Sequence, residues 1–321
     1  MNAPRLPRER TLVDPAVPAV LSAFAPAGPE AATVLRLFWI MLAGTVVVWT
    51  GVLAIAWRAA RDKRDTARDA RWLILAGGVA TPTIVLAALL AYGLWLMPRV
   101  RAEVPADALH VSVSGEQWWW RVRYDETGLE TANEIHVPAG RPVALSLDSP
   151  DVIHSFWVPA LAGKMDLIPG RRNTLVLQAD APGVFRGACA EFCGASHAQM
   201  RLLVVAQDPA SFRAWQRRQL APAHMATDGA GQAGRAAFLR NGCGACHTVR
   251  GTPAIGRVGP DLTHVGSRLE LAAGALPNEA ATLHDWIAHP DAHKPGALMP
   301  RFDVLGNDDI EAIAAWLESL Q

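Results

Sequence analysis

The sequence predicts a multidomain membrane protein with a two-helix transmembrane hairpin, a β-sandwich domain and an all-α domain at the C-terminus. Three observations predict this architecture. Two long runs without a charged residue, 37–57 and 72–98, lie near the N-terminus. Short strand-like segments separated by glycine fill residues 105–207, and helical periodicity returns in 232–321 around a paired-cysteine motif. These changes of pattern divide the 321 residues into domains.

We expect five segments along the chain. The first is rich in proline and alanine, and small flexible residues separate the strand-like and helical parts. The boundaries are 1–31 for the irregular N-terminal segment, 32–104 for the transmembrane hairpin, 105–220 for the β-sandwich domain, 221–231 for the linker and 232–321 for the all-α domain.

The two apolar runs, of 21 and 27 residues, each exceed the roughly 20 that a helix needs to cross a bilayer core. Their length and flanking arginines argue against two buried helices of a soluble protein. Pro82 should kink the second helix. Six basic residues in 58–71 put this connection in the cytoplasm, so the chain after residue 99 is expected to be periplasmic or extracellular.

The region after the hairpin has the signals of β-structure. Residues 109–113 and 143–147 alternate between apolar and polar side chains, and 174–177 and 202–205 are short apolar runs. Several short strands at this spacing predict an antiparallel sandwich or barrel. Asp208, which a proline follows, predicts the start of a short helix.

Composition excludes some classes of function. The chain has 30 basic and 30 acidic residues, so bulk charge gives no reason to expect a nucleic-acid partner. No acid–base or nucleophile constellation stands out, so we expect no bond-making chemistry in this chain itself. All four cysteines belong to two local motifs.

The first motif holds Cys189, Cys193, His197 and Met200 within twelve residues. Thiolate, imidazole and thioether are soft ligands that favour copper. On one helix the outer two of the Cys-Cys-His set would lie about 12 Å apart, so we expect a loop around metal. Zinc stays possible, although methionine is a poor zinc ligand, and a disulfide would leave His197 and Met200 unexplained. His154 is the best upstream candidate for a second imidazole.

The second motif, Cys243-Gly-Ala-Cys-His247, is the attachment signature of c-type haem. Cys243 and Cys246 would form thioethers to the haem vinyl groups, and His247 would supply one axial nitrogen. Met299 is the preferred second axial ligand, because it lies in a proline-flanked loop and His/Met ligation is typical of cytochromes c. Four histidines compete for that position: His264, His284, His289 and His293.

Helix signals surround the second motif. Phe238 lies on a predicted helix before it, and a last helix that begins at Asn307 repeats apolar residues at helical spacing. We expect this last helix, capped by Asn307, to pack near Phe238. A further helix is predicted over 278–289, with Asn278 as its cap.

These motifs resemble subunit II of the haem–copper cytochrome c oxidases. The pattern Cys-x-Glu-x-Cys-x3-His-x2-Met at 189–200, the aromatic stretch Gly115-Glu-Gln-Trp-Trp-Trp120 and the segment 164–171 all match it. The fused haem motif is similar to that of the caa-type oxidases. Glu116 stands where many relatives have histidine. The resemblance covers nearly the whole chain from about residue 25, and it implies a cupredoxin fold for 105–220.

The resemblance also implies a set of metal ligands. Two copper ions would form a copper A centre bridged by both thiolates of the loop. The side chain of Glu191 would contact magnesium at the interface with the catalytic subunit. The implied copper ligands are His154, Cys189, the main-chain carbonyl of Glu191, Cys193, His197 and Met200.

By the same resemblance, the chain passes electrons from haem c to copper A and on to subunit I, which reduces oxygen in a proton-translocating complex. Subunits I and III, a lipid bilayer and a donor, either a soluble cytochrome or a quinol-oxidising complex, are the implied partners. A bacterial inner membrane is the implied location. Two alternatives stay open: a copper A nitric oxide reductase, and a stand-alone membrane-anchored electron carrier.

Trp118 is implied as the residue through which electrons reach the copper, at the surface of the domain. The alternative is ordinary packing of the strand. With seven basic and ten acidic residues, 232–321 carries a formal charge of −3 with histidine neutral. We therefore expect it to dock around Trp118 through mainly apolar contacts with modest salt dependence.

Overall fold

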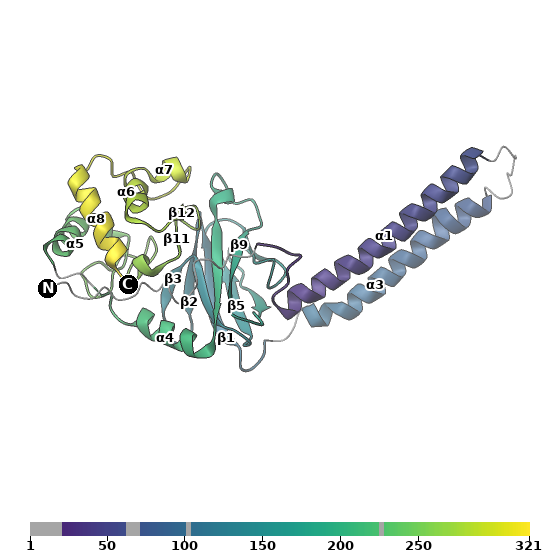
Figure 1. The fold of residues 1–321 in the computed structure, drawn as a ribbon, viewed down its shortest axis with the longest axis horizontal. Coiled ribbons are helices and arrows are strands. Elements are labelled where there is room, and N and C mark those ends of the chain that lie inside the picture. Colours follow the sequence, from purple (N-terminus) through teal and green to yellow (C-terminus); the bar gives the residue numbers. More distant parts are fainter. Residues whose placement is uncertain (1–20, 62–70, 101–103, 225–227) are drawn as a thin grey trace. The chain divides into compact units, whose positions relative to one another are not determined.

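The structure is a computed structural model that describes residues 21–61, 71–100, 104–224 and 228–321. The chain divides into two compact units (Figure 1). One unit is 32–105, and the other joins the described part of 1–31 to 106–321. Most of the segment 1–31 and most of the basic connection 58–71 lie outside the described residues.

The first unit contains the predicted hairpin. Helix α1 (Pro29–Arg61) precedes the π-helix η2 (Ile74–Ala80), which continues into α3 (Thr81–Val100). Two helices, Pro29–Arg61 and Arg71–Met97, are long and apolar enough to cross a membrane, as the sequence predicts. The wider π-helical turn comes directly before Pro82, and both the main-chain N–H and the hydroxyl of Thr81 donate to the carbonyl of Ala76.

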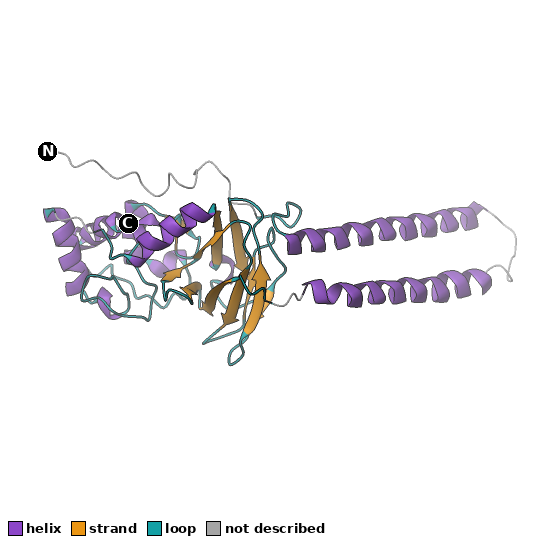
Figure 2. Ribbon diagram, turned by 90° about the horizontal axis from the view of Figure 1, so that it is seen from below, coloured by secondary structure: helices purple, strands orange, loops and turns teal. Residues whose placement is uncertain are grey.

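The second unit begins with two five-stranded sheets, which are orange in Figure 2. The first has the order β3-β2-β1-β5-β8, and the second β4-β10-β9-β6-β7. The strands of the first sheet are β1 (Leu109–Glu116), β2 (Trp119–Tyr124), β3 (Glu130–Ala132), β5 (Val143–Asp148) and β8 (Asn173–Leu177). Those of the second are β4 (Glu134–Pro138), β6 (His154–Trp157), β7 (Met165–Leu167), β9 (Gly183–Cys189) and β10 (Arg201–Gln207).

The sheets enclose one hydrophobic core. Alternate residues of β1 are buried, as the predicted alternation requires, and they share this core with apolar residues of β9 and β10. The hydroxyl of Tyr124 in the first sheet donates to the carbonyl of His136 in the second, at 2.8 Å. Trp120 is fully buried and meets Phe156 edge to face at 5.8 Å. The predicted β-sandwich is thus confirmed, but its sheets are mixed rather than antiparallel, since β1 pairs in parallel with β5 and β10 with β4.

Helix α4 (Pro209–Leu220) follows the sandwich. The carboxylate of Asp208 accepts hydrogen bonds from the main-chain N–H groups of Ala210 and Ser211, so the predicted cap is confirmed. Trp215 on this helix stacks on His136 with the ring centres 4.1 Å apart.

The rest of the second unit is mainly helical. Its elements are α5 (Gly229–Arg240), the 3-10 turns η4 (Cys243–Ala245) and η5 (Val265–Ser267), the short strands β11 (Glu270–Leu271) and β12 (Leu276–Pro277), and the helices α6 (Ala280–Ala288), α7 (Pro290–His293) and α8 (Asn307–Ser319). A further 3-10 turn, η3 (His197–Gln199), lies in the sandwich between β9 and β10. Helix α5 begins inside the stretch predicted as a linker.

The first and last helices of this region cross closely. The rings of Phe238 on α5 and Trp316 on α8 are 5.0 Å apart, which confirms the predicted contact. A Cβ on Gly234 would lie 2.2 Å from the carbonyl oxygen of Ala312, so only glycine permits the crossing.

Two predicted caps are wrong. Asn307 is the first residue of α8, the cap position belongs to Gly306, and no side chain caps this helix. Helix α6 starts at Ala280 rather than at 278. The amide of Asn278 instead donates to the carbonyls of Val265 and Arg268, because a buried side-chain amide needs partners in its own surroundings.

Candidate functional site

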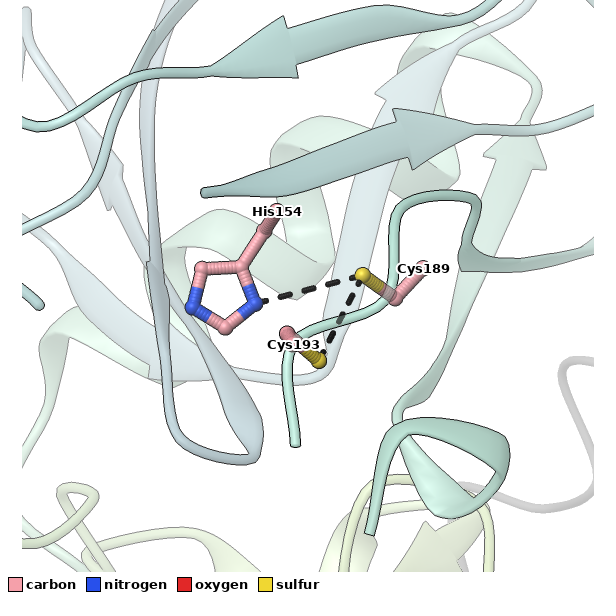
Figure 3. A group of neighbouring side chains, drawn as sticks. All are labelled: His154, Cys189 and Cys193. Atoms are coloured by element: carbon pink, nitrogen blue, oxygen red, sulfur yellow. Dashed lines mark hydrogen bonds between the residues drawn. The ribbon is translucent and has the colours of Figure 1, made fainter. Parts of the chain in front are cut away.

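Strand pairing brings the first motif and its distant histidine together. Cys189 is the last residue of β9 and pairs with Phe156 of β6, two residues after His154. The loop that follows Cys189 returns at Met200, whose carbonyl accepts from the Cys189 N–H at 2.9 Å. Figure 3 shows the ring of His154 directed at the sulfur of Cys189, which in turn contacts the sulfur of Cys193; all three ligand atoms lie within 4.8 Å of one another.

The possible ligand atoms lie close to one another. His154 Nδ1 is 3.9 Å from Cys189 Sγ, which is 3.8 Å from Cys193 Sγ. That sulfur is 3.6 Å from His197 Nδ1 and 3.9 Å from Met200 Sδ. A disulfide needs sulfur atoms about 2.05 Å apart, so the two thiols are not bonded to each other.

Glu191 divides its functional groups between two environments. Its main-chain carbonyl oxygen lies 3.2 Å from the sulfur of Cys189. Its half-exposed carboxylate points away and comes within 4.0 Å of the amine of Lys164. Lys164 begins the segment that resembles the surface facing the catalytic subunit.

His154 is fully buried, and its other ring nitrogen is engaged. Nε2 lies 2.9 Å from a carboxylate oxygen of Asp151, which leaves Nδ1 directed at the sulfur. Burial would raise the pKa of Asp151, but hydrogen bonds from His154 and from main-chain N–H groups lower it. A Cβ on Gly115 would lie 3.0 Å from the ring of His154, so glycine makes room for the imidazole.

The two thiols affect each other's protonation. A hydrogen bond from Cys193, assisted by His154, holds the pKa of the Cys189 thiol well below its usual range, although burial opposes this. The same hydrogen bond raises the pKa of Cys193, because its proton is shared with the Cys189 thiolate. Binding of a metal by both sulfurs requires that both thiols lose their protons.

Gln117 and Trp118 hold the loop 190–200, here called the metal loop, from the side. The amide of Gln117 and the indole N–H of Trp118 both donate to the carbonyl of Cys193, at 2.7 and 3.0 Å. Trp118 was expected at the surface, but only 8% of it is exposed. The region after residue 228 covers it, and a Cβ on Gly296 would lie 2.9 Å from the indole.

The second motif borders a cavity of about 300 Å³. Cys243, Cys246, His247 and Met299 all line it, together with apolar side chains of α5, α6 and α8. Its remaining walls include Trp118 and other residues at the end of the sandwich. The cavity therefore lies between the haem motif and the end of the sandwich, where Trp118 contacts the main chain of Cys193.

His247 is oriented by its main-chain surroundings. Its Nδ1 lies 2.8 Å from the carbonyl of Pro260, so Nδ1–H donates and Nε2 is left as the acceptor. Burial lowers the pKa of His247, which favours the neutral ring that an iron ligand requires. Gly259, the residue before Pro260, approaches the imidazole of His247 so closely that a Cβ on it would lie 2.4 Å from the ring.

None of the four competing histidines lines this cavity. His264 contacts the carbonyl of Ala221, and His284 contacts the side chain of Asn307, both at 3.0 Å. His289 and His293 share the carboxylate of Asp285. Of the five candidates for the second axial ligand of the haem iron, Met299 is thus the one that lines the same cavity as His247.

The residues present fit both cofactors that the sequence implies, a copper centre and a c-type haem. Two thiols, two imidazoles, a thioether and a carbonyl oxygen form a largely buried set of soft donors, which suits copper. An apolar cavity with two thiols and one available imidazole nitrogen suits covalently bound haem. No sequence signal beyond a Gly-Pro dipeptide points to Gly259 and Pro260, and none points to the buried Lys294.

Comparisons with known proteins agree with this organisation. The family model described as the periplasmic domain of cytochrome c oxidase subunit II matches residues 125–207. The family model described as cytochrome c matches residues 231–321.

Individual relatives carry the same description. A cytochrome c oxidase subunit 2 of Alkalihalophilus pseudofirmus is 39% identical over 219 residues, covering 68% of this chain and 63% of the relative. The chain thus spans less than two thirds of that relative's length. A cytochrome c oxidase subunit 2 of Metridium senile is 31% identical over 195 residues, covering 53% of this chain and 76% of the relative. A solved periplasmic domain of subunit II from Bradyrhizobium japonicum is 31% identical, with a TM-score of 0.35, over 36% of this chain and 96% of that one.

Proposed function

Since this chain belongs to the family of cytochrome c oxidase subunit II, we propose that it transfers electrons within a caa-type respiratory oxidase. Its own cytochrome c domain would be the internal donor to copper A. When bound, haem c and the dinuclear copper A centre supply reversible one-electron carriers. The protein binds, orients and shields them.

On the copper side, we propose that two metal ions bind the six residues His154, Cys189, Glu191, Cys193, His197 and Met200. The short distances between their donor atoms support this assignment. The contact of Asp151 with the buried His154 fixes which imidazole nitrogen is available. Burial of Cys189, Cys193 and Met200 limits the movement of these ligands when the charge of the site changes.

On the haem side, Cys243 and Cys246 would bind the porphyrin covalently, and His247 and Met299 would bind the iron. The hydrogen bond from His247 to Pro260 supports the assigned tautomer. The apolar walls exclude water, and a methionine opposite a histidine raises the reduction potential.

The observation that carries the proposal is the position of Trp118. Its ring lines the cavity of the haem motif, and its indole N–H donates to the main chain of Cys193. One side chain therefore touches both candidate sites. We propose Trp118 as the connection between them.

Beyond this chain, we propose that oxidase subunit I receives the electrons and reduces oxygen, with subunit III in the same proton-translocating complex. The pair formed by Lys164 and the carboxylate of Glu191 would face subunit I, with magnesium bound nearby. A soluble cytochrome or a quinol-oxidising complex would reduce the haem. We further propose a bacterial inner membrane, with both large domains on the periplasmic side.

The full chain, tagged and purified from its native membrane in mild detergent, tests this proposal. We expect it to bring with it a large multi-haem subunit that consumes oxygen. The Cys193→Ser variant should purify with the same subunit but lose oxygen uptake. Reduction of nitric oxide in place of oxygen would indicate a nitric oxide reductase. Purification of the chain alone, with both cofactors bound, would indicate a stand-alone carrier.

A further inference from the structure

The cytochrome c region and the copper-binding region of this chain meet through specific polar contacts. The carboxylate of Glu270 accepts two hydrogen bonds from Arg186, and that of Glu134 accepts one from the N–H of Leu269 at 2.6 Å. These contacts differ from the mainly apolar docking that the charge count predicts. Net charge does not reveal that individual ion pairs can form at an interface.

Lys294 has the most unusual environment at this interface. Only 4% of the residue is exposed. Its amine donates to the carbonyl of Trp118 in the copper region and, at 3.0 Å, to that of Ala272 in its own region. Burying an amine is costly unless polar atoms receive its hydrogens. Lys294 meets this requirement only because a carbonyl from each region lies within its reach.

The two residues after Lys294 continue the contact. The hydroxyl of Ser196, in the metal loop, donates to the carbonyl of Pro295 at 2.8 Å. Gly296 has φ +80° and passes directly over the indole of Trp118. Any side chain at this position would be strained and would also meet the ring.

Met299 lies three residues further along the same loop and borders the haem cavity. We name residues 294–299 the docking loop. One end of this loop contacts Trp118 and the metal loop, and the other end carries the candidate iron ligand. Fixing the first end therefore also fixes the distance between Met299 and Trp118.

Resting on the proposed function, we propose that Lys294 is a positioning residue that holds the docking loop on Trp118 and so keeps the haem and copper sites in one arrangement. It acts through the main-chain carbonyl of Trp118, at the edge of the haem cavity, and is not one of the candidate metal or haem ligands. The ion pair between Arg186 and Glu270 supports the same arrangement from the edge of the interface.

Amine labelling of the full chain tests the buried state directly, because the sequence has three lysines: Lys63, Lys164 and Lys294. The side chain of Lys164 is 49% exposed and serves as an internal standard. In a brief reaction with an acetylating N-hydroxysuccinimide ester, we expect Lys294 to react at least about tenfold more slowly than Lys164. Equal labelling of the two in native protein would overturn the proposal.

Opening the interface should expose Lys294. Glu270→Gln removes the ion pair with Arg186, so we expect the labelling ratio of Lys294 to Lys164 to rise several-fold. The matched control is Asp309→Asn, which removes an ion pair with Arg240 inside the cytochrome region. The haem absorbance spectrum checks that each variant is folded. A ratio that rises equally in both variants would contradict a specific interface.

Lys294→Met keeps the apolar stem and removes the amine. We expect amide hydrogen exchange in 115–120 to accelerate at least threefold or so, while exchange in β5 stays unchanged. The control is Arg141→Met, which removes an exposed cation of the sandwich that pairs with Glu126. Haem-to-copper electron transfer should slow about tenfold or more with both absorbance spectra unaltered, a combination that general unfolding would not produce. Unchanged exchange would overturn the proposal, whereas failure of the chain to purify with an oxidase would affect only the proposed function.

Discussion

The indole Nε1 of Trp118 lies 3.0 Å from the carbonyl oxygen of Cys193, so the tryptophan is hydrogen-bonded to the main chain of a candidate copper ligand. The opposite edge of the same ring lies under Gly296. A packing role alone would not require the indole to lie between the two candidate sites. This position gives Trp118 a testable role.

Trp118→Phe should slow haem-to-copper electron transfer substantially, because the smaller ring loses both the hydrogen bond and part of the contact with Gly296. Flash-photolysis kinetics measures the rate, and the copper spectrum should change little. Trp157→Phe is the control, since Trp157 is partly exposed and does not border the haem cavity. A Trp118 variant with the parental rate would assign this residue to packing.

Cys193→Ser should abolish the absorbance and electron paramagnetic resonance signal of a mixed-valence copper pair. A serine oxygen is a harder ligand than a thiolate and does not favour copper in the same way. Copper analysis per chain measures the loss. Cys243→Ser, which disturbs haem attachment, should leave the copper signal in place. An unchanged signal in the first variant would refute the ligand assignment.

Met299→Ala should remove the weak red-edge absorbance band of His/Met ligation and lower the reduction potential of the haem. Redox titration monitored by absorbance measures both effects. The control, Met165→Ala, changes a methionine of β7 outside the cavity and should leave the haem unaffected. If the band persists in Met299→Ala, a histidine binds the iron.

Docking of the two regions should strengthen as pH rises above neutrality. Burial lowers the pKa of Lys294 from 10.5 to about 7, although the nearby Cys193 opposes this. Between these values the open state binds a proton that the docked state lacks, so opening takes up a proton. The opening free energy should then rise by up to about 1.4 kcal/mol per pH unit, and level off below pH 7 or so.

Amide exchange of residues 115–120 between about pH 7 and 9, corrected for the intrinsic exchange rate, measures this dependence. Lys294→Met should show a flatter slope, because it has no amine to titrate. Equal slopes in the two proteins would mean that Lys294 is not responsible.

The connection 58–71 should be cytoplasmic. Protease added to intact spheroplasts should release the domains that follow residue 104 and spare this connection. Permeabilised spheroplasts provide the control, in which both regions become accessible. Cleavage of 58–71 from outside would reverse the proposed orientation.

The sequence by itself determined the features that depend on neighbouring residues. The two apolar runs predict α1 and α3, because helix length against bilayer thickness is a local property. The spacing of Cys189, Cys193, His197 and Met200 predicts one loop, since a loop of twelve residues can bring their donor atoms close together. Asp208 is likewise a local cap, whose partners are two and three residues away.

Tertiary structure decided the relations between residues far apart in the chain. Pairing of β6 with β9 brings His154 to Cys189, and packing against the sandwich gives Lys294 the carbonyl of Trp118. Asn278 is of a residue type that often caps helices, but its side-chain amide donates to buried main-chain carbonyls instead. Periodicity and spacing describe only the nearest neighbours along the chain. A contact such as Lys294 with Trp118 depends on how whole elements pack, which no local pattern contains.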